Sequence, residues 1–190
     1  MKTYICLIRH GQTDWNSRGL IQGITDNPLN SKGIEQAENA ANLLLKTDPN
    51  WDIILSSPLS RAYNTALIIA KYLNYEKEII KNPLFQERKF GVAEGEILNK
   101  KMYEEIFQEK IPGMEKLSDL KKRGIEALLE IDKKYSGKRV IVTTHSQFIK
   151  GILAALDKDF DFTMYLKNSS LNYFSVDNGK IEMIKYNITE

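Results

Sequence analysis

The chain has 190 residues, a formal net charge of +2 and one cysteine, and these values exclude several classes of protein. So small and evenly spread a charge does not favour binding to nucleic acid or to an acidic membrane surface. A single cysteine suits the reducing cytosol. The first apolar run is too short for a signal peptide, and no run approaches the ~20 residues of a membrane span. We therefore expect a cytoplasmic protein with one domain over residues 1–190.

The predicted elements alternate between strands and helices up to residue 145. Short apolar runs rich in β-branched residues predict buried strands at residues 4–9, 52–57 and 139–144. Apolar residues at helical spacing predict helices over 32–46, capped by Ser31, over 58–73, beginning at Pro58, and over 119–135. This alternation indicates an α/β fold with three layers, in which a mostly parallel central sheet carries helices on both faces.

Two segments depart from this alternation. The runs SLNYFSV and KIEMIKYN flank the turn signal Asp177-Asn178-Gly179, so we expect the sheet to end in a C-terminal antiparallel hairpin. Residues 85–117 show no strand pattern, and we interpret them as a long excursion with a short helix near residues 101–109. The edge strands and the hairpin leave a homodimer open.

Each of the three predicted strands is followed by side chains that carry chemistry. Arg9 and His10 come at the end of the first strand, Arg61 follows the second, and His145 follows the third. Because ligands of α/β sheets bind beyond the carboxyl ends of the strands, we expect these four groups to lie together. Two imidazoles and two guanidiniums suit a tetrahedral oxyanion, and phosphate is our hypothesis. A helix beginning near His145 would add backbone N–H groups.

Other chemistries match the sequence less well. A zinc site needs three or four ligands, but the sequence has neither a Cys/His cluster nor a His-x-x-x-His spacing, so we expect no metal. The Gly-x-Ser-x-Gly elbow of serine hydrolases and the glycine-rich loops of nucleotide-binding proteins are also missing. We therefore expect a phosphate site that works without a cofactor.

Five longer stretches carry a family resemblance. They are LIRHGQTDWN, RGLIQGITDNPLNSKGIEQA, SSPLSRAYNTA, QERKFGVAEG and VIVTTHSQFIKGIL. In this order, and over most of the chain, they resemble the histidine phosphatase, or phosphoglycerate mutase-like, superfamily. The resemblance implies a phosphatase that hydrolyses small organic phosphomonoesters through a phosphohistidine intermediate.

The resemblance also implies a role for each matching residue. His10 would be the nucleophile, and Arg9, Arg61 and His145 would hold the phosphoryl oxygens. Glu87 would protonate the leaving alcohol and then activate water, a task that requires burial or the charge of the phosphate to keep it protonated. The implied contacts to the phosphate and the rest of the substrate are Asn16, Gln22, Gly23 and Ser146.

Some positions depart from the family pattern. Ala93 stands where the family usually has Trp, and Ser146 stands where Gly usually follows the second histidine. Glu94 is a rival of Glu87 for the role of acid, and we rank it second, as a structural contact. The stretch IPGMEK matches the family's Pro-Gly-Gly-Glu-Ser only in part, which leaves a substrate contact by Glu115 open.

Two other functions remain as alternatives to a phosphatase. A cofactor-dependent phosphoglycerate mutase must exclude water and grip a carboxylate, which family mutases do with a longer insertion that carries an Arg pair. Here the excursion is short and has Lys100 and Lys101 instead, so we favour hydrolysis. A non-catalytic phosphate-binding regulatory module would not need Glu87. The partner is a small phosphorylated metabolite in each case, and the sequence does not identify it.

Overall fold

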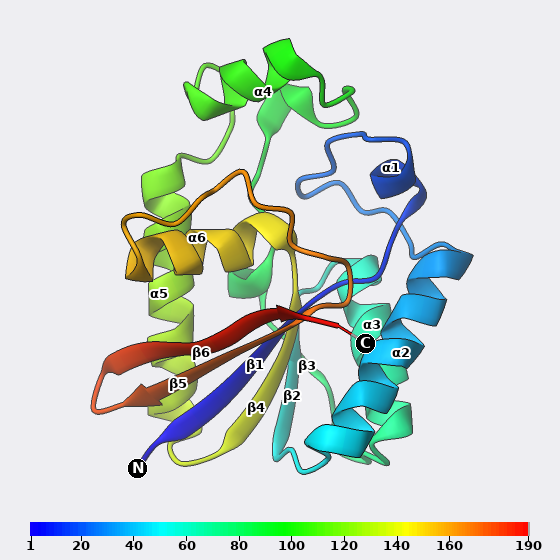
Figure 1. The fold of residues 1–190 in the computed structure, drawn as a ribbon, viewed down its shortest axis with the longest axis vertical. Coiled ribbons are helices and arrows are strands. Elements are labelled where there is room, and N and C mark those ends of the chain that lie inside the picture. The colour runs from blue at the N-terminus through cyan, green and yellow to red at the C-terminus, as the bar shows by residue number, and fades with distance from the viewer. Residues whose placement is uncertain (190) are drawn as a thin grey trace.

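The computed structural model describes residues 1–189, and its six strands form one sheet with helices on both faces (Figure 1). The strands lie in the order β3 (Ile80–Lys81), β2 (Ile53–Ser56), β4 (Arg139–Thr144), β1 (Thr3–Arg9), β5 (Leu171–Asp177) and β6 (Lys180–Ile188). The first four of these are parallel, whereas β5 runs antiparallel to β1 and pairs with β6 as a hairpin. The predicted fold class is confirmed, including its C-terminal hairpin.

The helices divide between the two faces because residues of a strand point alternately to either side. On one face, α2 (Ser31–Thr47) and α3 (Ser60–Tyr72) pack against Cys6 and Ile8 of β1. On the other face, α5 (Leu117–Lys134) and α6 (Ser146–Leu156) pack against Ile5 and Leu7. These four side chains of β1 are completely buried. None of the helices in the described part of the chain combines the length and apolarity that crossing a bilayer requires.

Three predicted helix starts were wrong by one or two residues, including that of α5, which begins at Leu117 and not at residue 119. The helix α2 is capped by Asn30, whose side chain accepts a hydrogen bond from Gly33 N at 2.9 Å, so Ser31 is already helical. Pro58 precedes α3, which begins at Ser60. The short elements β3, α1 (Asp14–Ser17), η1 (Pro83–Phe85) and η2 (Gly91–Ala93) were not predicted, since two to four residues leave no periodic pattern.

The register of the parallel strands brings the three predicted strand ends together. Arg9 of β1 lies opposite Thr144 of β4, so the next residues, His10 and His145, leave neighbouring strands at the same level. The main chain continues this pairing, because His10 N donates to the Thr144 carbonyl at 2.9 Å. The sheet itself therefore places the two histidines side by side.

The excursion over residues 85–117 lies beyond the carboxyl ends of the strands (Figure 1). Its helix, α4 (Lys100–Phe107), has no buried residue, and Phe107 is 75% exposed. A small apolar cluster beneath it contains Phe90, Ala93 and Ile111, together with Ile21. The side chain of Ala93 is buried in this cluster. Because Ala93 stands where the family usually has the larger Trp, the cluster forms only a small core. The excursion over residues 85–117, which we call the cover, is therefore thin above the carboxyl end of the sheet.

Candidate active site

His10 presents one ring nitrogen for chemistry because the backbone holds the other. Its Nδ1 lies 2.6 Å from the carbonyl of Gly11, a partner that can only accept, so Nδ1 carries the ring proton. The remaining nitrogen, Nε2, accepts a hydrogen bond from Arg61 Nε at 3.2 Å. Burial, together with the charges of Arg61 and Arg9, lowers the pKa of His10 well below its ordinary value of 6.5. His10 is therefore a neutral base at physiological pH, with its lone pair on Nε2.

The ring of His145 packs against the ring of His10. The two ring centroids are 5.2 Å apart, and His145 is completely buried and does not line the neighbouring cavity. Its Nε2 lies 2.8 Å from Ser57 Oγ, a hydroxyl that accepts from Leu59 N and has one proton to donate. With Ser57 as the donor, the ring proton lies on Nδ1, which has no hydrogen-bond partner among the described residues. Burial is also the main cause that lowers the pKa of His145 well below 6.5.

Two arginines supply positive charge at the same place. Arg61 is completely buried, and its two Nη atoms donate to the carbonyls of Thr25 and Gly23 at 2.8 and 2.7 Å. Burial lowers the pKa of Arg61 to about 10, so it stays protonated at neutral pH. Arg9 is 6% exposed and donates from Nη1 to the Leu166 carbonyl, whereas its buried Nε has no partner among the described residues. Unsatisfied donors of this kind favour an anion.

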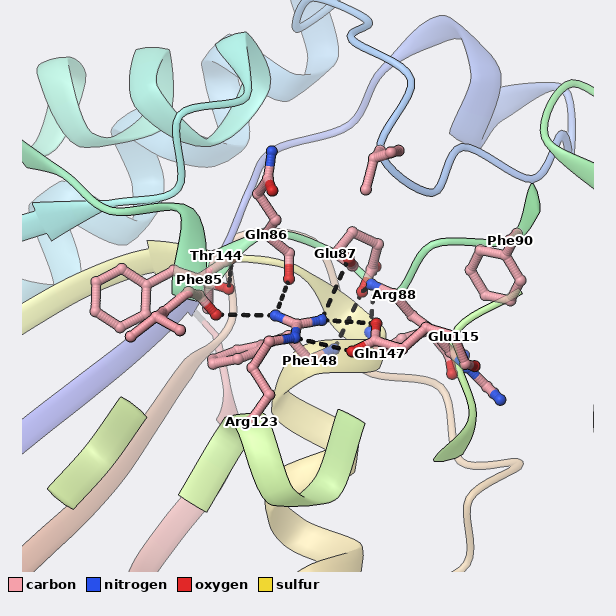
Figure 2. A network of polar contacts seen from close by, with 12 residues as sticks. Phe85, Gln86, Glu87, Arg88, Phe90, Glu115, Arg123, Thr144, Gln147 and Phe148 are labelled. Carbon is pink, nitrogen blue, oxygen red and sulfur yellow. Dashed lines mark hydrogen bonds and ion pairs between the residues drawn. The ribbon is translucent and has the colours of Figure 1, made fainter. Parts of the chain in front are cut away.

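Glu87 lies at the N-terminus of α6, within the reach of three backbone N–H groups. Its Oε1 accepts from Arg88 N at 2.9 Å and from Phe148 N at 3.1 Å, and its Oε2 accepts from Gln147 N at 3.2 Å (Figure 2). These donors and the positive end of the helix stabilise a negative charge on the carboxylate. The backbone at the start of α6 therefore holds the carboxylate of Glu87 in a fixed position.

Arg123 of α5 holds the segment that carries Glu87 (Figure 2). Its Nη1 donates to the carbonyls of Leu84 and Gln86, both at 2.8 Å, and its Nη2 lies 3.4 Å from the carbonyl of Glu87. The two carboxylate oxygens of Glu115 accept from Nε and Nη2 of the same guanidinium, at 2.9 and 2.8 Å. Glu115 is therefore occupied as the partner of Arg123, which answers the question of a substrate contact that the sequence left open.

A cavity of about 190 Å³ joins most of the predicted residues, and we call it the phosphate cavity. Of the predicted site residues, those that line it are Arg9, His10, Asn16, Gln22, Gly23, Arg61, Glu87 and Ser146. Asn16 accepts from Thr13 N through Oδ1 at 3.2 Å, which leaves its amide Nδ2 as the donor for a ligand. Gly23 adopts a positive φ of 54°, and a Cβ there would overlap Glu94, so the loop requires glycine.

Glu94 has a structural role. Its two oxygens accept from the backbone N–H groups of Ile24, Thr25 and Phe90 at 3.2, 2.9 and 3.0 Å. The Thr25 hydroxyl adds a fourth bond at 2.6 Å. Because four donors occupy this carboxylate and it does not line the phosphate cavity, ranking Glu94 below Glu87 is consistent with the structure.

Sequence reasoning missed two residues that shape the site. Ser57 contacts Nε2 of His145, and Arg123 positions the segment around Glu87. Ser57 is the last residue of the strand predicted over 52–57, so its position was a usable signal. Arg123 lies in a helix rich in charged residues, and its main-chain partners leave no trace in the sequence. Among residues 1–189, no group of three or more His, Cys, Asp or Glu side chains gathers as a metal ion would require.

The family model of the histidine phosphatase superfamily (branch 1) matches residues 5–189. The chain belongs to this superfamily. The predicted resemblance is confirmed, and at this level so is the expectation of a phosphatase.

Known relatives agree with this assignment. An uncharacterised phosphatase, PhoE, from Bacillus subtilis is 36% identical over 98% of this chain and 95% of its own length. A metal-independent phosphoserine phosphatase from Arabidopsis thaliana is 38% identical over 79% of this chain and 67% of its own. Several 2,3-bisphosphoglycerate-dependent phosphoglycerate mutases match as well, at 28 to 33% identity.

A solved structure shows the same arrangement of the chain. The phosphoserine phosphatase from Entamoeba histolytica, in complex with 3-phosphoglyceric acid, superposes with a TM-score of 0.85 at 29% identity. The match covers 99% of this chain and 98% of that one.

Proposed function

We propose that this phosphatase hydrolyses small organic phosphomonoesters in two steps through a phosphohistidine on His10. In the first step, the Nε2 lone pair attacks phosphorus while the ester P–O bond breaks and its electron pair leaves with the alcohol oxygen. Glu87, protonated in the presence of the phosphate, gives its proton to that oxygen. The products of this step are the free alcohol and a phosphoryl group bonded to Nε2.

In the second step, water attacks phosphorus and loses a proton to the Glu87 carboxylate. The P–N bond breaks, its electron pair returns to Nε2, and inorganic phosphate leaves. Throughout both steps Nδ1–H donates to the Gly11 carbonyl, which stabilises the positive charge of the phosphorylated ring. Arg9, Arg61, the amide of Asn16 and Nδ1–H of His145 are the donors that we assign to the phosphoryl oxygens.

One observation carries this proposal. A neutral His10, with Nε2 directed to an arginine and Nδ1 held by a carbonyl, shares one small cavity with an acidic side chain. A module that only binds phosphate needs the cations but has no use for Glu87. The arrangement therefore supports turnover.

The substrate is a small phosphorylated metabolite, and the relatives narrow its chemistry. The named relatives include a phosphoserine phosphatase and a protein that holds 3-phosphoglyceric acid, and both of these ligands carry a carboxylate. A mutase needs a grip on that carboxylate from its insertion. Here Lys101 is exposed and lies 3.8 Å from Glu105, and neither it nor Lys100 lines the phosphate cavity. Hydrolysis is the better supported outcome.

Location and assembly follow as further proposals. The single cysteine, Cys6, is a buried core residue, as expected for a protein of the reducing cytoplasm. The sheet has β6 at one edge, where it offers unpaired main-chain groups to a second copy. Size-exclusion chromatography with light scattering distinguishes a homodimer from a monomer.

The test incubates the protein with a labelled aryl phosphate or with 3-phosphoglycerate and quenches the reaction within its first turnover. We expect acid-labile, alkali-stable phosphate on His10, followed by release of inorganic phosphate. Rapid interconversion of phosphoglycerates would instead identify a mutase, and binding without label or turnover would identify a regulatory module. Activity should survive EDTA, and its loss on chelation would contradict a metal-independent reaction.

A further inference from the structure

A second cavity, which none of the proposed steps uses, lies beside the phosphate cavity. Its volume is about 350 Å³, and it shares Tyr103, Ile106 and Gln147 with the wall of the phosphate cavity. Two adjoining cavities of this size can accept different parts of one small molecule. We call the second one the side cavity.

A buried ammonium group lies in the apolar wall of the side cavity. Phe107, Leu117 and Phe162 belong to this wall, together with Lys150 of α6. Lys150 is only 7% exposed, and its Nζ lies 5.0 Å from the centroid of the Phe162 ring. It makes no hydrogen bond or ion pair with the residues that the structure describes. Burying an ammonium without an anionic partner costs free energy, so this position suits a negatively charged ligand.

The acidic side chains near Lys150 already have other hydrogen-bond or ion-pair partners. Glu87 accepts three backbone hydrogen bonds, and Glu109 lies 3.3 Å from Arg88 Nη2. Asp161 is exposed and accepts from Thr163. Burial lowers the pKa of Lys150 to about 8, although Glu87 opposes this shift. An anionic group of a ligand would be the ion-pair partner that the ammonium group of Lys150 lacks among the described residues.

Gln147 adds a second unmatched group to the same wall. Its Oε1 is buried and has no hydrogen-bond partner among the described residues. Gln147 and Lys150 are three residues apart on α6, and side chains at this spacing lie on one face of a helix. The side cavity therefore offers the ammonium of Lys150 and the acceptor of Gln147 close together, while its other two charged residues, Arg88 and Glu109, pair with each other. Figure 2 shows Gln147 next to Glu87.

We infer that the side cavity is a subsite for the organic part of the substrate, where Lys150 binds a carboxylate and Gln147 accepts from a neighbouring hydroxyl or ammonium group. This inference rests on the proposed function and deepens it. The substrate class becomes phosphomonoesters of hydroxy or amino carboxylic acids. Lys150 then determines specificity and takes no part in the transfer of the phosphoryl group.

The experiment measures binding in the His10→Ala variant, which cannot form phosphohistidine. Isothermal titration compares O-phosphoserine with phosphoethanolamine, which differs from it only by the missing carboxylate. We expect phosphoserine to bind about tenfold or more tightly, as a charge-assisted hydrogen bond predicts, and Lys150→Met in the same background to remove most of this advantage. The pair 3-phosphoglycerate and glycerol 3-phosphate, which has no ammonium group, should show the same preference, as expected if the preference depends on the carboxylate.

The control is Lys158→Met, which removes one positive charge at an exposed position just beyond α6 and should leave both ratios unchanged. Equal weakening of both members of a pair by Lys150→Met would overturn the inference, because it indicates a structural role. So would equal affinities of phosphoserine and phosphoethanolamine for the His10→Ala variant. Turnover of an aryl phosphate by the unmodified protein tests the proposed function separately, since that ester has no carboxylate and the binding ratios do not depend on turnover.

Discussion

The two ends of the phosphate cavity are built in different ways. One end is formed by His10 and Arg61, with His145 packed against His10, at the carboxyl ends of the strands, and each of these side chains is buried and held by hydrogen bonds. The opposite end belongs to the excursion, where α4 has no buried residue. The difference teaches that the site for the phosphoryl group is rigid, whereas the cover that meets the leaving group depends on a few contacts such as those of Arg123. Four predictions test this division.

The largest effect is expected at the rigid end, for His10→Ala. Without the nucleophile, kcat should fall by on the order of 10⁴-fold or more, as for other enzymes that lose the covalent step. The phosphohistidine should vanish, while inorganic phosphate still binds, because the arginines remain. Steady-state kinetics and acid-quench labelling measure both results. A variant that kept a label on another residue would place the nucleophile elsewhere.

Glu87→Gln tests the opposite end. Loss of a general acid should lower kcat by about 10²–10⁴-fold for alkyl phosphates. The loss should be much smaller in the first step for 4-nitrophenyl phosphate, whose leaving group needs no proton. Glu94→Gln is the comparison, because Glu94 holds a loop and has no contact with the phosphate cavity. If the dependence on the leaving group followed Glu94 instead, the assignment of the acid would be wrong.

Arg123→Lys tests whether the main-chain segment, and not only its carboxylate, has to be positioned. Lysine cannot bind both oxygens of Glu115 and three carbonyls at once, so we expect kcat for alkyl phosphates to fall by about 10- to 100-fold. The rate of phosphorylation by an aryl phosphate should change much less than with an alkyl ester. Equal losses for both esters would instead indicate general destabilisation, which thermal unfolding detects.

The smallest effect concerns stability against pH. The pKa values of His10 and His145 are lowered in the folded protein, so below pH 6.5 the unfolded chain binds more protons and stability falls as the pH falls. As the pH falls from 6.5 to 5.5, the slope of the free energy of unfolding against pH should approach the value for a difference of two bound protons. His10→Ala should reduce this difference to about one. Urea unfolding in a sulfonate buffer without phosphate measures the slopes. Stability independent of pH in this window would mean that the histidines are protonated in the fold.

Much of the rigid end was predictable because strand ends and buried apolar runs are local signals. The positions of His10 and His145 followed from three apolar runs and from the rule that parallel strands end at one edge of the sheet. The family resemblance was needed for Glu87, whose place at the start of α6 depends on a contact between segments 60 residues apart.

The contacts around the cover were not predictable for a related physical reason. Arg123 binds main-chain carbonyls, and any residue can supply a carbonyl, so the partner leaves no mark in the sequence. Lys150 looked like one charged residue in an otherwise apolar helix, and only the fold shows it buried beside a cavity. Interactions with the backbone and cavities between distant segments are properties of the tertiary structure.

The most direct test of the central claim is a crystal structure of the protein with orthovanadate, which imitates a phosphoryl group in transfer. We predict a vanadium atom bonded to His10 Nε2, with its equatorial oxygens bound by Arg9, Arg61 and Nδ1 of His145, and with Glu87 next to the apical oxygen opposite Nε2. Vanadate bound away from His10, or held by the arginines without a bond to Nε2, would contradict the account.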